Sequence, residues 1–416
     1  MEQEEEMKPY PTCSKVRVLA LCVGLALAAA VIGACGGEQA PQSVFYEFLR
    51  FVPDRPEYRE YLTFGDAAAW HASWGIPRID NKEQLDSLER EPRAYWEYSM
   101  GRQTTPPGYL ANYLLAEDQR SFYGFDLLNL DRYLVAGSPP DEITVAGFGF
   151  DAKQIVDALT GSGYQAEKLE PAGTLYSIRG DYEVDPNSPN KTGQLGNLNR
   201  IALLDGEMVI GKATAPVTVS LEAYSDQIPS LADDPAYVAL LQALADPALA
   251  GTGQLMGAIV MDDLEISARD YAMELLRGKT AQQVDEKLAE LSQGPQLPAY
   301  SLVAFVTSHT EGATYLILAV VFAEGTDAQS AADLLADRLQ NYRSPRYRRL
   351  LSEEWAERGA KVEKALAVEA GGLPVALVLV RADDPPPIPP DQPLGNVAVP
   401  WWADIVWNRD LGFLWR

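Results

Sequence analysis

One apolar segment near the N-terminus constrains the whole chain, because it decides in which compartment the remainder folds. The segment runs from Val18 to Gly37 and reads VLALCVGLALAAAVIGACGG. Its apolar part, Val18–Ala34, has the length of a signal-peptide core and is slightly short for a helix that spans a bilayer, which takes about 20 residues. Length alone leaves both interpretations open, and the end of the segment separates them.

The segment breaks off at a cysteine, which follows directly on Ile32-Gly33-Ala34. The sequence Ile32-Gly33-Ala34-Cys35 resembles the lipobox of bacterial lipoproteins, with a branched aliphatic residue followed by small residues before the cysteine. The resemblance implies cleavage between Ala34 and Cys35 and a diacylated thiol on Cys35. Two acyl chains anchor stably, since each buried methylene contributes about 0.8 kcal/mol and a single chain holds only marginally. The alternative is an uncleaved N-terminal helix with a coincidental cysteine.

The residues ahead of the apolar segment contain one irregularity. MEQEEE carries four glutamates, whereas a signal peptide has a positive leading segment. Translation from Met7 would leave Lys8, Lys15 and Arg17 with no acidic residue before the apolar segment. We therefore predict that Met7 is the true start. N-terminal sequencing of the unprocessed precursor tests this prediction, and a precursor that begins at Met1 would contradict it.

Cysteine and charge counts exclude several classes of function. The three cysteines are Cys13, Cys22 and Cys35, so no free thiol remains after processing for a disulfide, a cysteine-ligated metal or a nucleophile. Of 34 basic and 59 acidic residues, three basic and four acidic ones precede Cys35, which leaves 31 and 55 in the mature part. A surface with this excess of negative charge repels nucleic acid, so we expect no nucleic-acid partner.

The mature part is too long for one small domain, so the sequence predicts two. The boundary rests on the small and turn-forming residues of Asp246–Gly253. Gly36–Gln42 spans at most about 24 Å when fully extended, which keeps the first domain close to the membrane. The predicted parts are a lipoprotein signal peptide (1–34), the lipidated cysteine and tether (35–42), a first domain (43–246), a second domain (253–384), and a Pro-rich connector with a Trp-rich tail (385–416).

Short strands in adjacent pairs, each group followed by a helix, predict an α+β fold with antiparallel sheets and helices packed on one face. In the first half Ile143–Phe150 is strand-like, Asp151 caps a helix, and Asp205-Gly206 marks a hairpin. In the second half two long strands, Tyr300–Thr307 and Thr314–Phe322, precede a helix and a further hairpin. The similar order of elements indicates two similar domains, although the halves do not align residue by residue.

Two of these stretches carry a resemblance to a group of proteins. They resemble uncharacterised bacterial lipoproteins that combine a lipobox with a GxFD-like junction between strand and helix and with a LADDP-like helix start. The junction is here Gly147-Phe148-Gly149-Phe150-Asp151, and the helix start is Leu231–Pro235. The resemblance covers the chain from Phe45 to Leu244 and implies no activity.

The sequence contains no catalytic motif: GxSxG, HExxH and a P-loop are all absent. Gly147 and Gly149 lack the third glycine of a dinucleotide loop, because Ala152 stands in its place. The two histidines are His71, on a predicted helix, and His309, in a predicted hairpin turn where we expect it to be exposed and without a partner. We therefore predict no catalytic, cofactor-binding or metal-binding residue and favour a non-enzymatic protein.

Arginines gather in one stretch of this acidic chain. Arg338–Arg349 reads RLQNYRSPRYRR, and guanidinium groups that alternate with tyrosines suit phosphate or an anionic polymer. The alternative is that the arginines neutralise a helix C-terminus and pair with carboxylates such as Glu353 and Glu354. The predicted anion-binding residues are Arg343, Arg346, Arg348 and Arg349.

The C-terminal tail is rich in tryptophan and follows the proline-rich connector Pro385–Pro393. Trp401, Trp402 and Trp407 could form an aromatic surface at the bilayer interface or on cell-wall sugar. The alternative is that the tail folds back and seals the core.

Two functions from different classes follow from these features. The favoured one is a non-enzymatic protein that is anchored to the cell membrane through lipid on Cys35, on the extracytoplasmic side. It would bind a ligand, an envelope protein or an envelope polymer, or serve envelope assembly. The rival is a hydrolase of cell-envelope polymer, which would need two carboxylates about 5 to 10 Å apart in one cleft.

Overall fold

The computed structural model describes residues 43–416 except 80, 91, 94–95, 97–106, 108, 111–115, 127, 129, 150–151, 170–172, 263, 265, 267 and 385–400. The predicted lipobox, the three cysteines, the helix cap at Asp151 and the proline-rich connector lie outside the described residues. Within the described part, no helix combines the length and apolarity that a bilayer crossing requires.

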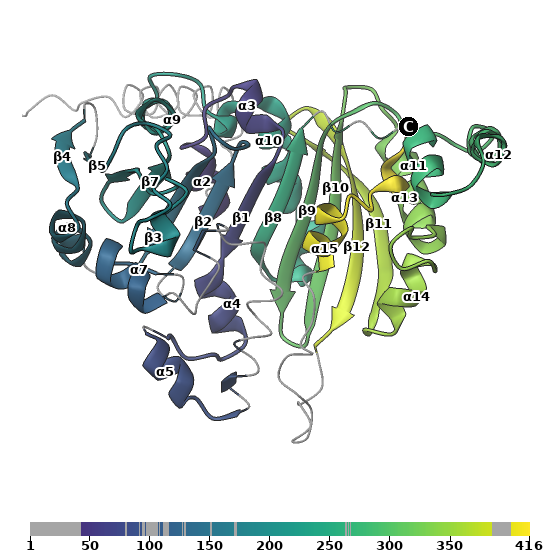
Figure 1. Ribbon diagram of the computed structural model, residues 1–416. Coiled ribbons are helices and arrows are strands. Elements are labelled where there is room, and N and C mark those ends of the chain that lie inside the picture. Colours follow the sequence, from purple (N-terminus) through teal and green to yellow (C-terminus); the bar gives the residue numbers. More distant parts are fainter. Residues whose placement is uncertain are drawn as a thin grey trace, which may run out of the picture. The chain divides into compact units, whose positions relative to one another are not determined.

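A single antiparallel sheet forms the centre of the fold (Figure 1). In the described residues it has 12 strands in the order β11-β12-β10-β9-β8-β1-β2-β3-β7-β6-β5-β4. The strands are β1 Leu62–Asp66, β2 Leu130–Ala136, β3 Ile143–Phe148, β4 Gln165–Lys168, β5 Thr174–Ser177, β6 Arg200–Leu203, β7 Glu207–Gly211, β8 Gln254–Asp262, β9 Tyr300–Thr310, β10 Ala313–Phe322, β11 Ala360–Ala370 and β12 Leu373–Asp383.

Tight turns join the neighbouring strands where the sequence has glycine. The predicted hairpin at Asp205-Gly206 is confirmed, since it connects β6 to β7 and Gly206 has a φ of 94°. Gly312, with a φ of 84°, turns the chain from β9 to β10. Such left-handed backbone is strained for residues with a Cβ, so glycine sets the position of the turn and thereby the register.

Helices cover both faces of the sheet, which confirms the α+β class and corrects the expectation of a single helical face. Helices α2, α9 and α10 pack on one face, over Phe64, Val145 and Val260. Helices α11, α13, α14 and α15 pack on the opposite face over the second half, and α7 and α8 do so over the first half. The central strands are apolar on both sides, as in β10 and β12, and therefore need cover on both.

The helices have the following bounds: α2 Val44–Leu49, α3 Pro56–Arg59, α4 Ala67–Ser73, α5 Lys82–Ser87, α7 Ala116–Tyr123, α8 Ala152–Gly161, α9 Thr214–Tyr224, α10 Pro235–Leu244, α11 Ala268–Leu275, α12 Ala281–Leu291, α13 Ala328–Asn341, α14 Leu351–Ala356 and α15 Trp401–Trp407. The predicted helix start in Leu231–Pro235 is confirmed. Asp234 caps α10 by accepting from the backbone N–H groups of Ala236 and Tyr237.

The strand order repeats itself about the centre of the sheet. Strands β8-β9-β10-β12-β11 follow the same plan as β1-β2-β3-β7-β6, and β1 pairs antiparallel with β8 where the two sets meet. The helix after the third strand, α8 in one set and α13 in the other, packs on the same face in both. The sheet is thus continuous across residues 246–253, where the sequence indicates a boundary and where the short 3-10 helix η5 (Pro247–Thr252) leads into β8.

One arginine ties the centre of this sheet together. Arg59, just before β1, lies between three carboxylates, with Nη1–Oδ2 2.6 Å to Asp262 at the end of β8 and Nη2–Oδ2 2.6 Å to Asp234 at the start of α10. Its Nε donates to Oδ1 of Asp54 at 2.8 Å. Burial disfavours the guanidinium charge, but these bonds hold the pKa of Arg59 above its ordinary value.

Candidate ligand-binding site

The predicted arginine stretch begins inside α13 with a residue that has a structural role. Arg338 is buried and donates to the backbone carbonyls of Pro295, Phe413 and Trp415 at 2.7, 3.2 and 2.5 Å. Its guanidinium lies 3.9 Å from the ring centroid of Trp415. Burial lowers the pKa of Arg338 to about 10. The Arg338 side chain therefore holds the C-terminal segment at Phe413 and Trp415 against α13.

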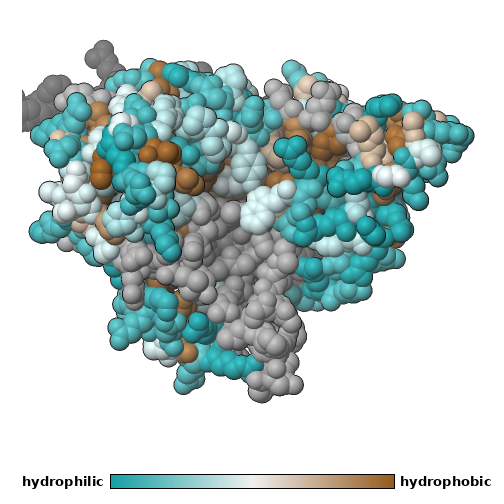
Figure 2. Space-filling model, viewed as in Figure 1, coloured by the Kyte–Doolittle hydropathy of each residue, from teal (hydrophilic) through white to brown (hydrophobic). Residues whose placement is uncertain are grey.

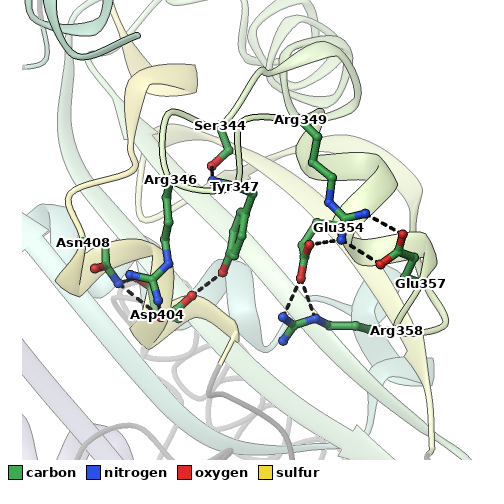
Figure 3. A network of polar contacts seen from close by, with 9 residues as sticks. All are labelled: Ser344, Arg346, Tyr347, Arg349, Glu354, Glu357, Arg358, Asp404 and Asn408. Atoms are coloured by element: carbon green, nitrogen blue, oxygen red, sulfur yellow. Dashed lines mark hydrogen bonds and ion pairs between the residues drawn. The ribbon is translucent and has the colours of Figure 1, made fainter. Parts of the chain in front are cut away.

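Two of the four predicted anion-binding arginines already bind carboxylates (Figure 3). Arg346 pairs with Asp404 of α15 at 2.9 Å. Arg349 pairs with Glu354, which Arg358 also contacts, and with Glu357 at 2.5 Å. For Arg346 and Arg349 the structure therefore matches the alternative interpretation of the sequence, in which arginines of this stretch pair with carboxylates.

The other two predicted arginines line a pocket that further basic residues share. Arg343 and Arg348 are exposed, and the pocket of about 670 Å³ lies between their loop, the end of α11 and the end of α15. The basic residues that line it are Arg277, Lys279, Arg343, Arg346, Arg348 and Arg409. We call this cavity the basic pocket.

Four of these six cations have no carboxylate partner in the described part of the chain. Arg277 is paired with Glu274 at 2.6 Å, and Arg346 with Asp404. Lys279, Arg343, Arg348 and Arg409 form no ion pair among the described residues, although the whole chain has a net charge of −25. Their positive charge is therefore available to a ligand.

A buried aspartate fixes the start of the loop that carries Arg343 and Arg348. Asp410 accepts hydrogen bonds from the hydroxyls of Tyr342, at 2.5 Å, and Ser344. Burial raises the pKa of Asp410, and these bonds oppose the rise. Arg348 and Arg409 have φ values of 59° and 52°, so both sit at sharp turns of the backbone. The basic pocket thus has a frame held by hydrogen bonds, with long exposed side chains at its rim.

A second, more apolar pocket adjoins the basic pocket. It has a volume of about 990 Å³ and lies where the ends of β8, α11 and α15 meet the start of β1. Figure 2 shows apolar surface between the end of β8 and α11, bordered by hydrophilic surface. The residues that line both pockets are Glu274, Arg277, Pro345, Asn408 and Arg409. The principal apolar lining residues of this apolar pocket are Met261, Leu264, Ile266, Tyr271, Val406 and Leu411.

Two further carboxylates line the apolar pocket and not the basic pocket. They are Glu60, before β1, and Glu142, before β3. Burial raises the pKa of Glu142, which Lys212 opposes. The side chains of Tyr61 and Trp407 also line this pocket.

The tryptophan tail docks on the sheet for most of its length. Trp402 is 2% exposed, its indole donates to the carbonyl of Val306 at 3.1 Å, and its ring packs edge-on against Phe305 and Trp355. Trp402 therefore does not belong to an exposed aromatic surface, because its ring seals the core. Trp407 is 51% exposed, and the side chain of Trp401 lies outside the described residues.

The two histidines differ in burial, with His309 enclosed and His71 half-buried. The expectation that His309 is exposed and without a partner is wrong: β9 extends to Thr310, His309 is 5% exposed, and its Nε2 lies 3.1 Å from Asp384. The ring of Trp74, the C-cap residue of α4, packs against the His309 ring, with 5.3 Å between the two ring centroids. His71 is half-buried, and burial lowers its pKa to about 4. The described residues contain no cluster of metal-ligating side chains.

Sequence reasoning missed the part of the site that comes from distant elements. Arg277, Lys279 and Arg409 lie far from Arg338–Arg349 in the chain, and the apolar lining comes from β8, α11 and α15. Nothing local marks these residues, because only the folded sheet brings the three segments together. The one available signal was Arg409 itself, a cation inside the aromatic tail.

No protein-family model matches the sequence, and no curated protein does. Among solved structures, crystal form III of TP0453 aligns with 80% of this chain and 93% of its own, at 9% identity and a TM-score of 0.31. Crystal form I of TP0453 aligns with 87% of this chain and 97% of its own, at 7% identity and a TM-score of 0.32. Both likenesses are too weak to carry an argument about this chain.

Proposed function

We propose that this chain is a lipid-anchored protein of the extracytoplasmic membrane face that binds an anionic ligand and performs no catalysis. The basic pocket carries the proposal. Its four unpaired cations, Lys279, Arg343, Arg348 and Arg409, gather in one cavity of a chain with a net charge of −25. Like charges repel one another, so this arrangement is most stable when an anion neutralises it.

The anchoring part of the proposal rests on the sequence at Ile32-Gly33-Ala34-Cys35, which lies outside the described residues. Mass spectrometry of the protein purified from membranes tests it. We expect a mature N-terminus at Cys35 that carries acyl chains. An unmodified Cys35 would contradict the anchoring proposal and leave the pocket without a membrane context.

Anion binding is tested by isothermal titration of the full chain with inorganic pyrophosphate, a small anion with several negative charges. The variant R348N/R409N removes two unpaired cations and suits both turns, because asparagine tolerates left-handed backbone. We expect it to weaken pyrophosphate binding about tenfold or more, since charge-assisted bonds are worth about 1.5 kcal/mol each.

The matched control is K361Q/K364Q, which removes two exposed lysines from β11, outside the basic pocket. We expect it to bind pyrophosphate like the wild type. If both double variants lose the same affinity for pyrophosphate, binding depends only on the net charge of the protein. That result would contradict a binding site in the basic pocket.

A second candidate function, hydrolysis of envelope polymer, is supported by Glu60 and Glu142 in the apolar pocket. Burial raises the pKa of Glu142, as a general acid requires. The assay is release of reducing ends from purified cell-wall glycan by the wild type and by E142Q. Activity that E142Q abolishes would establish the hydrolase and overturn the non-catalytic proposal.

A further inference from the structure

We propose that the ligand is an anionic lipid of the membrane, with its headgroup in the basic pocket and its chain in the apolar pocket. This inference rests on the proposed function and specifies its ligand. It follows from the continuity of two cavities of opposite character, which share Arg277 and Arg409 along their common border.

The apolar pocket has the size and lining that a hydrocarbon chain requires. Its volume of about 990 Å³ lies at the upper end of the range for small-molecule sites, roughly 300 to 1,000 Å³. Leu264 and Ile266 are half-buried, so their side chains still expose apolar surface that a bound chain would remove from water. A small free anion would leave this surface wet.

Charge determines which way round the lipid lies. The cations line the basic pocket: Arg277 and Arg409 line both pockets, whereas Lys279, Arg343 and Arg348 line the basic pocket and not the apolar one. The carboxylates that line the basic pocket already have partners within the protein. Glu274 pairs with Arg277, and Asp410 accepts hydrogen bonds from Tyr342 and Ser344. Glu60 and Glu142 line the apolar pocket and not the basic pocket, so they would repel an anionic head placed there. The headgroup therefore belongs in the basic pocket.

The source of the lipid follows from the length of the tether. Gly36–Gln42 reaches at most about 24 Å, so the domain stays within reach of the bilayer to which Cys35 would bind it. The lipids of that bilayer are therefore the proposed source of the ligand.

The test is photo-crosslinking of the full chain in nonionic maltoside micelles. The probe is dodecyl phosphate with a diazirine near the chain end, and the matched probe is the same chain with a zwitterionic phosphocholine head. Peptides that contain Leu264, Ile266 and Val406–Leu411 should carry the label. We expect the phosphate probe to label them about tenfold more than the phosphocholine probe, as for loss of one to two charge-assisted contacts.

Variants separate the two ends of the proposed ligand. R348N/R409N should reduce labelling by the phosphate probe about tenfold and leave the phosphocholine probe unchanged. K361Q/K364Q should leave both probes unchanged. L264N, which makes the apolar lining polar, should reduce labelling by both probes. Equal labelling by the two probes, or label spread over exposed surface alone, would overturn the inference.

The pyrophosphate titration and the crosslinking together distinguish failure of the lipid inference from failure of the proposed function. If pyrophosphate binds the wild type tightly, loses affinity in R348N/R409N, and no probe labels the apolar pocket, the ligand is a free anion and only the lipid inference is overturned. If pyrophosphate fails to bind and neither probe labels the pocket peptides, both proposals are overturned.

Discussion

At the scale of single residues, burial decides whether an arginine of this protein is part of the framework or available to a ligand. Arg338 and Arg348 come from the same short stretch, yet one is enclosed by three carbonyls and the other is exposed at the rim of the basic pocket. Sequence composition treats them alike. The difference arises because Arg338 lies within α13 and reaches the carbonyls of the C-terminal segment, whereas Arg348 follows the end of that helix.

Replacement of Arg338 tests its structural role. R338M leaves the carbonyls of Pro295, Phe413 and Trp415 without their donor and should lower the free energy of unfolding by at least about 2 kcal/mol. R338K should fall between the wild type and R338M, because an ammonium group lacks the planar fork that reaches three acceptors. The measurement is urea denaturation, with the exposed Arg269→Met as the control expected to change stability by less than about 0.5 kcal/mol. An R338M variant with the same free energy of unfolding as the wild type would contradict this role.

His71 should make the protein sensitive to acid. Burial, and to a lesser extent the charge of Arg78, lower its pKa from 6.5 to about 4. Between these two pH values the unfolded chain binds a proton that the folded chain does not. The free energy of unfolding therefore falls as the pH is lowered through this window, by at most about 3 kcal/mol from this group.

The comparison that isolates this effect uses H71Q, which cannot titrate. Chemical denaturation at pH 7, 6, 5 and 4 should show a steeper loss of stability for the wild type than for H71Q over this window. Parallel curves for the two proteins would mean that protonation of His71 costs the same in the folded and unfolded chains.

At the scale of elements, α15 connects the core to the candidate site. Trp402 on its inner side is buried against Phe305 and Trp355, and Trp407 at its end is half exposed beside the apolar pocket. W402A should therefore lower the free energy of unfolding by about 3 to 5 kcal/mol, as for other large aromatic residues in cores. W407A should cost less than about 1.5 kcal/mol, since the side chain of Trp407 is already 51% exposed and loses less buried apolar surface.

Thermal and urea denaturation of these two variants measure the difference directly. The pair serves as its own control, because both substitutions remove the same side chain from the same helix. Similar losses of stability in the two variants would contradict the view that one side of α15 seals the core while its end borders the site.

Local sequence patterns predicted many of the elements but not their environment. The hairpin at Asp205-Gly206 and the helix start at Asp234-Pro235 could be found because turn and cap chemistry acts within a few residues. His309 could not be placed correctly, because its burial depends on α4, which comes from the other half of the chain. The same limit applies to the basic pocket, whose basic residues come from three separate segments, 277–279, 343–348 and 409.

At the scale of the whole molecule, the candidate site lies beside the junction of the two sets of strands. Strands β1 and β8 meet there, with Leu62 opposite Val260 and Phe64 opposite Ala258. The apolar pocket takes Tyr61 from the start of β1 and Met261 from the end of β8. The repeated strand order thus creates a central junction, and the segments after β8 and after α15 cover it on one face.

Arg59 should stabilise this junction, and its replacement provides a test at the same scale. R59M leaves Asp54, Asp234 and Asp262 close together without their shared cation, so it should lower the free energy of unfolding by about 2 to 4 kcal/mol. Amide hydrogen exchange in β1 and β8 should accelerate more than exchange in β10 and β12, because the lost contacts lie at the ends of the first two strands. Arg55→Met, an exposed neighbour, is the control and should leave both measurements unchanged.

A double-mutant cycle decides whether the effect of R59M comes from the unpaired carboxylates. If it does, D262N in the R59M background should cost less than D262N alone or should restore stability, because it removes one of the repelling charges. The coupling between the two substitutions should then exceed about 1 kcal/mol, as for residues of one ion-pair network. Additive effects would show that Arg59 acts through packing of its aliphatic stem, and that the junction of β1 and β8 is held by the sheet hydrogen bonds and the core beneath it alone.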